Sequence, residues 1–268
     1  MTPLNLSPHT APPPEDHAGL LRLLGERPGP AVIWHHHEAD ASRVELSGRV
    51  LQNWAVKMIG LLDDEVSPEP GDLVLVDSAP HWKSAAAVLA VSALGCRVRL
   101  VTGPDDLEDS EGEEPALVVT DAPHRWEDAE ALGDAELAAL SPGLRDVSYE
   151  DAVGRPIPGW VLDVSADVPQ QPDQLAVPLP STPLPECPGA PTRGSVITQT
   201  EPPPTRSSEG APPEWTARRW TDDDVVAVML GTWARSGRVL LWQGEWADET
   251  GQPRREWLRT AEEESVPS

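Results

Sequence analysis

Two short apolar runs on either side of an alanine-rich stretch constrain the fold of this chain more than any other feature. Residues 72–76 read Asp-Leu-Val-Leu-Val, a short and continuous apolar run with two β-branched valines that is typical of a strand buried on both faces. Residues 82–94 are apolar nearly all round, which predicts a largely buried helix that ends at Gly95. Residues 97–101 predict the next strand. This order predicts a parallel βαβ unit with a right-handed crossover.

The same alternation of strands and helices continues on both sides of this unit. Residues 44–46 predict a short strand, and Ser47 can cap a helix over residues 48–62, whose apolar side chains recur every three or four positions. We therefore expect an α/β fold with a mostly parallel sheet and helices on both faces. Further strands are expected over 31–34, 116–119, 160–162, 174–177 and 239–242, and further helices over 17–24, 134–140 and 225–234.

Proline separates the folded part of the chain from segments that we expect to be flexible. Residues 178–213 are dense in Pro, Ser and Thr, and most of this stretch is unsuited to helices or sheet ladders. The expected organisation is a disordered tail (1–16), an α/β subdomain (17–177), a flexible Pro-rich insertion (178–215), a final helix–strand unit of the same domain (216–247) and a charged tail (248–268).

The charge of the chain argues against two classes of partner. It carries 45 acidic and 20 basic residues, a net charge of −25, which repels the phosphates of nucleic acids and anionic membranes. No apolar run approaches a membrane span, and the first residues lack the features of a secretory signal. Cys96 and Cys187 form no CxxC pair, which suits free thiols in a reducing compartment. We expect a cytoplasmic protein with neither nucleic acid nor membrane as partner, while a protein partner stays open.

The stretch from Arg43 to Val101 resembles the beginning of AMP-binding (adenylate-forming) enzymes, which include acyl-CoA synthetases. The resemblance is carried by RVELSGRVLQNWAVKMIGLLDDE, by EPGDLVLVDSAPHWKSAAAVLAVSALGCRVRLV, and by EPALVVTD at 114–121. In that family a Pro-Gly-Asp turn, here Pro70-Gly-Asp72, precedes the buried strand and the alanine-rich helix. The ELSG…NW…K run is most similar to a small family of truncated AMP-binding-like proteins of high-GC bacteria. The resemblance covers about half of the chain and implies the N-terminal subdomain fold of these enzymes.

The resemblance also implies a phosphate loop, in which backbone N–H groups, small hydroxyl side chains and a Lys surround the phosphates of ATP. Its counterpart here is expected at Thr192, Arg193, Gly194 and Ser195, with Arg193-Gly194 in the place of Lys-Gly. Upstream, proline-rich sequence replaces the Ser/Thr/Gly run, and proline has no N–H to offer a phosphate. We therefore expect a degenerate site, no cofactor, and neither ATP nor AMP as ligand.

Further motifs of the family have no recognised counterpart after the strand expected at residues 239–242. These are an acidic residue near the adenylate, a ribose-binding Asp, and a C-terminal domain with a catalytic Lys. The resemblance thus favours a catalytically degenerate protein without enzymatic activity of its own, which binds a protein partner or a small acyl or nucleotide-like ligand. The alternative is a subunit of a split acyl-adenylating or acyl-CoA ligase system, in which another chain supplies the missing domain.

The run of three histidines at 35–37 raises a third hypothesis, a metal-binding protein. On a continuing strand His35 and His37 share a face, and such a pair suits Zn or Fe with Glu38 or Asp40 nearby. The same run is also typical of a polar strand end that leads into a loop. We favour that interpretation and assign no metal site.

Overall fold

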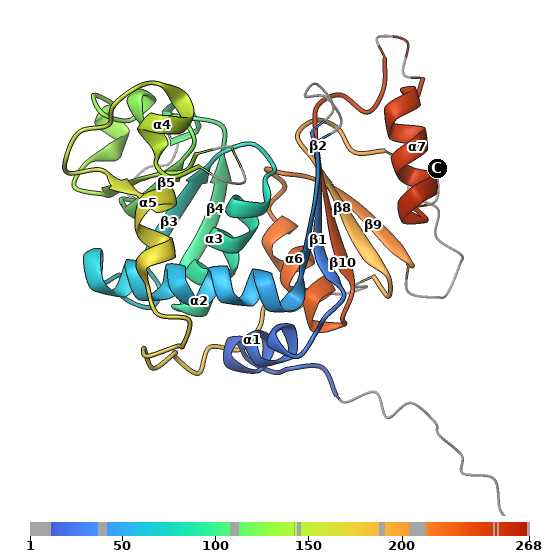
Figure 1. Ribbon diagram of the computed structural model, residues 1–268, viewed down its shortest axis with the longest axis horizontal. Helices are drawn as coiled ribbons and strands as arrows, with labels where there is room; N and C mark the ends of the chain where they lie inside the picture. Colours follow the sequence, from blue (N-terminus) through green and yellow to red (C-terminus); the bar gives the residue numbers. More distant parts are fainter. Residues whose placement is uncertain are drawn as a thin grey trace, which may run out of the picture.

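Two five-stranded sheets, with helices between them and on their outer faces, make up the protein in its computed structural model (Figure 1). The structure describes residues 12–36, 42–107, 113–141, 143, 146–187, 191–203, 213–248, 250 and 252–266. The helices are α1 (His17–Gly25), α2 (Gly48–Glu65), α3 (Trp82–Ala93), α4 (Tyr149–Val153), α5 (Val164–Asp167), α6 (Val225–Ala234) and α7 (Arg255–Glu264). The strands are β1 (Pro30–His36), β2 (Ser42–Ser47), β3 (Leu73–Asp77), β4 (Arg97–Val101), β5 (Pro115–Thr120), β6 (Glu136–Ala139), β7 (Leu162–Asp163), β8 (Gly194–Thr198), β9 (Trp215–Arg219) and β10 (Arg238–Gln243).

The first sheet has the order β4-β3-β5-β6-β7, and all of its strands are parallel. The chain leaves β3 through α3 to reach β4 on one side, and then returns to add β5 on the other side of β3. The direction of winding therefore reverses between β3 and β5. In open α/β sheets, ligands bind at such a reversal, outside the carboxyl ends of the strands.

The second sheet has the order β2-β1-β10-β8-β9, in which only β2 runs antiparallel to its neighbour. Helix α6 lies on the face toward the first sheet, and α7 lies on the outer face (Figure 1). Trp257 and Ala261 of α7 pack with Trp242 of β10 in a cluster of their own. Both faces of this sheet are thus covered.

The largest hydrophobic cluster fills the space between the two sheets and contains side chains from both, such as Val74 of β3 and Leu241 of β10. Every residue of α3 is buried, because this helix packs between α2 and the two sheets. Trp34 of β1 also links the second sheet to the connection between β3 and α3, since its indole N–H donates to the carbonyl oxygen of Pro80 at 3.0 Å. The sequence of α3, apolar nearly all round, is explained by this position.

The expected α/β fold with parallel strands and helices on both faces is confirmed. The strands nevertheless divide between two sheets, which local sequence patterns did not reveal. Residues 134–140 contain strand β6 and no helix, because their short apolar run pairs with β5 and β7. Periodicity alone does not separate such a run from a buried helix. Residues 174–177 form no strand, and β7 begins only at Leu162.

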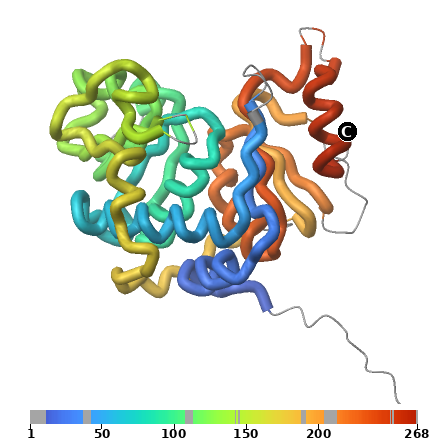
Figure 2. The backbone as a smooth tube through the Cα atoms, in the orientation of Figure 1, coloured from blue at the N-terminus to red at the C-terminus, as the bar shows by residue number. Residues whose placement is uncertain are grey.

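The proline-rich segment 178–215 differs from the flexible insertion that we expected. Strand β8 lies within it, buried along its whole length between β10 and β9. Before β8, Leu184 donates its backbone N–H to the carbonyl of Glu15 at 3.0 Å, and His17 contacts the carbonyl of Thr182. Figure 2 shows the chain crossing α2 and continuing to α1. The prolines flank β8 and leave its own five residues free to pair.

The charged segment 248–268 also contains structure that we did not expect, because helix α7 spans Arg255–Glu264. Glu264 is only 3% exposed and pairs with Arg43 at 2.8 Å and Arg238 at 3.3 Å. A buried carboxylate with two guanidinium partners, together with Trp257, holds this helix against the sheet. Of the expected N-terminal tail, residues 1–11 lie outside the described residues.

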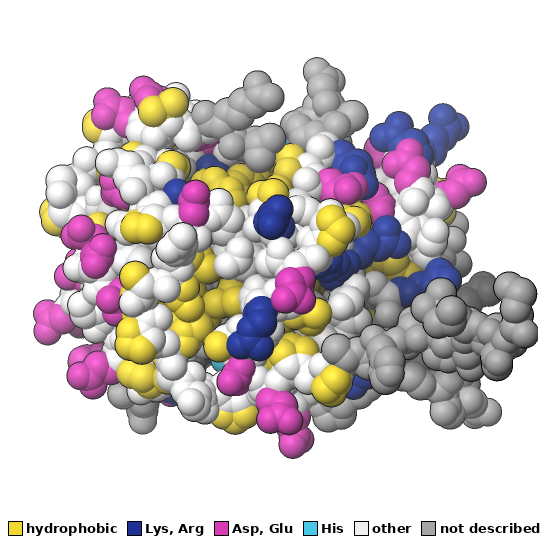
Figure 3. Space-filling model, turned by 60° about the horizontal axis from the view of Figure 1, so that its bottom comes forward, with side chains coloured by type: hydrophobic (Ala, Val, Ile, Leu, Met, Phe, Trp, Pro, Cys, Tyr) yellow, Lys and Arg dark blue, Asp and Glu magenta, His cyan; other side chains and the backbone are white. Residues whose placement is uncertain are grey.

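Charged side chains are unevenly spread over the face shown in Figure 3. Acidic side chains gather toward the side of the first sheet, and most basic ones lie toward the second sheet and α7. Hydrophobic side chains form a band between them that charged residues interrupt. Among the described residues, no helix is long and apolar enough to cross a membrane.

Candidate functional site

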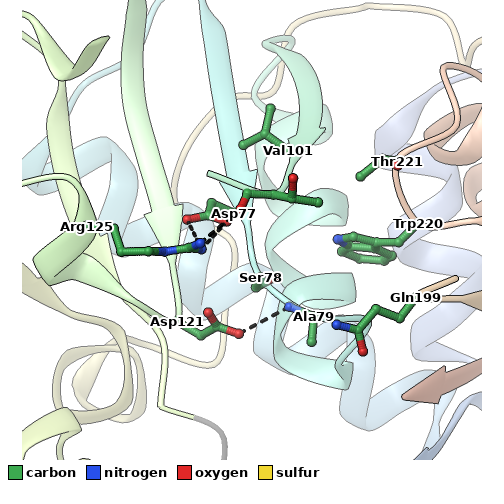
Figure 4. A pocket seen from close by; sticks show the side chains of 10 residues that line it. Asp77, Ser78, Ala79, Val101, Asp121, Arg125, Gln199, Trp220 and Thr221 are labelled. Carbon is green, nitrogen blue, oxygen red and sulfur yellow. Dashed lines mark hydrogen bonds and ion pairs between the residues drawn. The ribbon is translucent and has the colours of Figure 1, made fainter. Parts of the chain in front are cut away.

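A cavity of about 210 Å³ opens at the carboxyl ends of strands from both sheets (Figure 4). Strands β3, β4 and β5 of the first sheet end beside it, and so do β8 and β9 of the second. Since it lies where the winding of the first sheet reverses, this crevice is the candidate functional site. It is lined by Asp77, Ser78, Ala79, Val101, Thr102, Asp121, Arg125, Gln199, Trp220 and Thr221.

Asp77, at the end of β3, organises the wall of the crevice. Its carboxylate is 1% exposed and accepts hydrogen bonds from Arg125 Nη2 at 2.8 Å, Trp126 Nε1 at 2.7 Å and Thr120 Oγ1 at 3.0 Å. Arg125 also donates through Nη1 to the carbonyl of Thr102 at 3.0 Å. The negative charge of Asp77 and the positive charge of Arg125 therefore compensate each other. This ion pair stabilises the wall of the crevice and leaves neither charge unpaired for a ligand.

Asp121, directly after β5, is the second carboxylate of the crevice. Its Oδ2 accepts the backbone N–H of Ala79 at 3.1 Å. Burial raises the pKa of Asp121, and the nearby charge of Asp77 acts in the same direction, while the bond from Ala79 opposes the shift. The surroundings of Asp121 therefore disfavour further negative charge.

Trp220, directly after β9, supplies a donor without a partner. The side chain is 2% exposed, and its indole Nε1 is buried and has no hydrogen-bond partner among the described residues. Figure 4 shows this nitrogen directed into the cavity, opposite Arg125 and Asp121, with the amide of Gln199 directed toward Ala79. Trp220 Nε1 is one of several buried indole and imidazole nitrogens without a hydrogen-bond partner among the described residues. An unsatisfied buried donor costs roughly 1–3 kcal/mol, so an acceptor near this nitrogen would be favourable. Sequence reasoning had not singled out Trp220.

The residues expected to form the phosphate loop lie at the start of β8, whereas the crevice lies beyond its carboxyl end. The backbone N–H groups of Thr192, Arg193 and Gly194 donate to the carbonyls of residues 213 and 214 at 3.1, 2.9 and 3.2 Å. Ser195 is fully buried within the strand. In this structure these amides are engaged by the chain segment that leads into β9.

His35 lies on β1 beside α7, and its Nε2 is 3.9 Å from Glu264 Oε1. Its ring contacts that of Trp242, with ring centroids 6.0 Å apart, and burial lowers the pKa of His35. His37 lies outside the described residues, as do Glu38 and Asp40. The described part of the chain contains no group of three or more His, Cys, Asp or Glu side chains that could hold a metal.

Lys83 forms a second buried polar cluster, on the other side of α3. Its Nζ donates to the carbonyl and the hydroxyl of Ser141 at 2.9 Å each and to Ser165 Oγ at 3.0 Å. The side chain is 1% exposed, and burial lowers the pKa of Lys83 to about 8. The cluster fastens the start of α3 to the end of β6 and to α5. The sequence offered no signal for it, because these three residues are far apart along the chain.

No family model matches the chain. A curated protein of Mycobacterium tuberculosis (strain ATCC 25618 / H37Rv), which carries the name TIGR03089 family protein, is 30% identical over 143 residues, covering 53% of each chain. The chain thus spans about half the length of that relative.

Solved structures agree on the fold at low sequence identity. An acyl-CoA synthetase of Brucella canis has a TM-score of 0.55 at 16% identity, covering 88% of this chain and 47% of its own. The acetoacetyl-CoA synthetase of Streptomyces lividans has a TM-score of 0.59 at 12% identity, covering 88% and 39%. The N-terminal subdomain of Klebsiella oxytoca NpsA, in complex with 3-hydroxybenzoyl-AMSN, has a TM-score of 0.53 at 12% identity, covering 97% and 60%. The fold of this chain is therefore similar to that of the N-terminal regions of AMP-binding and acyl-CoA synthetase enzymes.

Proposed function

We propose that this chain is a binding module that holds a small molecule in the crevice between its two sheets. The observation that carries this proposal is the indole N–H of Trp220, which is buried, directed into the cavity and without a partner among the described residues. Buried polar groups in folded proteins are nearly always hydrogen-bonded. An acceptor atom of a ligand would supply the bond that this donor lacks.

We also infer that the chain does not activate carboxylic acids by adenylation on its own. The amides of residues 192–194 donate to the segment that precedes β9, so they do not surround an open space. In the crevice, Arg125 is already paired with Asp77, and Asp121 adds a carboxylate. Phosphate sites gather unpaired amides and cations, and the described residues at neither place offer that combination. The protein is, on this proposal, a degenerate relative of AMP-binding enzymes from a small bacterial family.

The location of the ligand is tested by filling the crevice. Ala79→Trp places a large side chain at its wall, and Ala131→Trp does the same at a separate surface hollow. Ligand-observed NMR with a fragment library is run on wild type and both variants. Fragments that bind wild type should lose binding to Ala79→Trp and keep binding to Ala131→Trp. If all bound fragments bind the three proteins equally, the crevice is not the site.

The absence of adenylation is tested separately, by ATP–pyrophosphate exchange with a panel of aliphatic and aromatic carboxylic acids. The isolated chain should give no exchange above a protein-free control. Exchange that depends on one of the acids would contradict this half of the proposal and leave the crevice test untouched.

A subunit of a split acyl-adenylating system is the second candidate function. It is favoured by the N-terminal subdomain of NpsA, a similar fold that was solved in complex with 3-hydroxybenzoyl-AMSN. Proteins captured on the tagged chain would be identified by mass spectrometry, and the captured complex would then be assayed for the same exchange. Exchange by the complex, but not by the chain alone, would establish this function in place of a binding module.

A further inference from the structure

We propose that the crevice selects an uncharged ligand that carries a carboxamide or an equivalent neutral group, with its acceptor toward Trp220 and its donor toward Asp121. This inference rests on the proposed binding function and names the chemical class of the ligand. It follows from the hydrogen-bonding character of each wall and from the balance of charge between them.

The Trp220 wall requires an acceptor. The indole ring has a single polar hydrogen and accepts no conventional hydrogen bond, so the group that faces Nε1 must present a lone pair. The rest of the ring is apolar, which favours a flat, largely hydrophobic body behind that acceptor. Gln199 enters the same space from the end of β8 and contributes an amide, which is neutral.

The Asp121 wall requires a donor. One oxygen of this carboxylate already accepts the N–H of Ala79 at 3.1 Å, and an ionised carboxylate only accepts. A ligand N–H group would bond to the carboxylate from the cavity side. Figure 4 shows Asp121 and Trp220 on opposite sides of the cavity, so one small ligand can face both.

The balance of charge argues against an anionic ligand. Arg125 is the cation of the lining, and its Nη2 contacts both oxygens of Asp77 at 2.8 Å. A carboxylate or phosphate would thus meet Asp121 without an unmatched cation, and desolvating it there would be unfavourable. A simple cation would pair with Asp121 but would leave Trp220 without an acceptor. A neutral carboxamide serves both walls at once.

Three probes of almost equal size separate these cases: benzamide is neutral, benzoate is an anion and benzamidine is a cation. Their size is suitable, because a cavity of roughly 150 Å³ accepts benzene in another protein, and this one measures about 210 Å³. Differences in binding among the three therefore report charge and hydrogen bonding rather than volume.

The experiment follows the indole N–H signals of ¹⁵N-labelled protein, which contains eleven tryptophans. Trp220→Phe removes one signal and so assigns it, while keeping an aromatic ring in place. Benzamide should shift the Trp220 signal, and Trp220→Phe should weaken benzamide binding roughly three- to tenfold, as expected for one hydrogen bond. Trp160→Phe, at a half-exposed tryptophan, should leave binding unchanged. Benzoate should bind about tenfold more weakly than benzamide. Asp121→Asn should reduce this difference in affinity, because it removes the negative charge that repels benzoate.

Two results would overturn the inference: benzoate binding at least as tightly as benzamide, or benzamide binding equally to wild type and Trp220→Phe. Should Trp220→Phe fail to fold, the test is the ratio of the dissociation constants of benzoate and benzamide, measured in wild type and in Asp121→Asn. Binding of benzoate or benzamidine that Ala79→Trp abolishes would refute the ligand class but leave the crevice as a binding site. If neither these probes nor any library fragment distinguishes Ala79→Trp from wild type, the proposed function itself fails.

Discussion

Arg125 donates through Nη2 to both carboxylate oxygens of Asp77, each at 2.8 Å, although the two residues are 48 positions apart in the chain. The neighbouring Trp126 donates its indole N–H to the same carboxylate at 2.7 Å. One buried acid at the end of β3 thereby holds the loop that follows β5, and with it one wall of the crevice.

We expect Asp77→Ala to lower the free energy of unfolding by about 2–3 kcal/mol. Trp126 would be left with a buried N–H and no acceptor, whereas Arg125, whose side chain is 41% exposed, can turn to water. Urea unfolding measures the loss. Asp64→Ala, on the exposed side of α2, is the control and should change stability little. Equal losses in the two variants would refute the role given to Asp77.

The attachment of α7 depends on Glu264, which pairs with Arg43 and Arg238. Glu264→Ala should destabilise the protein by roughly 2–4 kcal/mol, because two guanidinium groups lose their shared partner. The amide hydrogen-exchange rates of α7 should rise above their wild-type values, and those of β10 should rise less. Glu263→Ala, one position earlier and exposed, should leave both quantities near their wild-type values. Unchanged exchange in α7 of Glu264→Ala would show that the apolar contacts of Trp257 and Ala261 suffice to anchor the helix.

Gly194 marks the place where β8 packs too closely for a side chain. A Cβ there would lie 2.5 Å from the carbonyl oxygen of Arg238 and 2.6 Å from the ring of Trp215. We expect Gly194→Ala to shift the midpoint of urea unfolding downward, with a loss of about 1–3 kcal/mol. Gly159→Ala introduces a Cβ with no atom within 4 Å and should be neutral. A stable Gly194→Ala protein would argue against a buried β8.

The pH dependence of stability reports the burial of Lys83. Burial lowers its pKa from 10.5 to about 8, so between these values the unfolded chain binds more protons than the folded one. The contribution of Lys83 to stability therefore rises as the pH rises from about 8 to 10.5. Lys83→Met lacks this titration, and its stability relative to wild type should fall over the same interval. Urea unfolding of both proteins below and above this pH interval measures the difference between their free energies of unfolding. A difference that does not change with pH would contradict the burial of this amine.

The α/β class was predictable because its elements leave strong local signals. Helix α6 has the bounds Val225–Ala234 that its apolar spacing predicts, and β3 has the continuous burial that its apolar run predicts. Strand β8 was missed because its apolar core, Val196 and Ile197, is too short to stand out among flanking prolines. Its place between β10 and β9 depends on partners that follow it in the chain.

The candidate site was less accessible to sequence reasoning than the fold. Asp121 and Trp220 are unremarkable in the sequence, since each is a single polar or aromatic residue that follows a strand. The residues that stood out do not line the cavity, because His35 lies on β1 and Arg193 directly precedes β8. Motif reasoning pointed to the start of β8, whereas the cavity lies beyond the end of that strand.

By itself, the sequence determined the parallel βαβ unit, the buried α3 and the scaffold resemblance, because hydrophobic periodicity is a property of neighbouring residues. Only the tertiary structure decided that the strands form two sheets, that α7 packs on the outer face, and that Asp77, Asp121 and Trp220 meet at one crevice. These arrangements depend on contacts between residues far apart in the chain. Their free energy comes from burial and charge pairing between distant residues, and a local pattern shows that a residue is apolar or charged but not which distant residue it will contact.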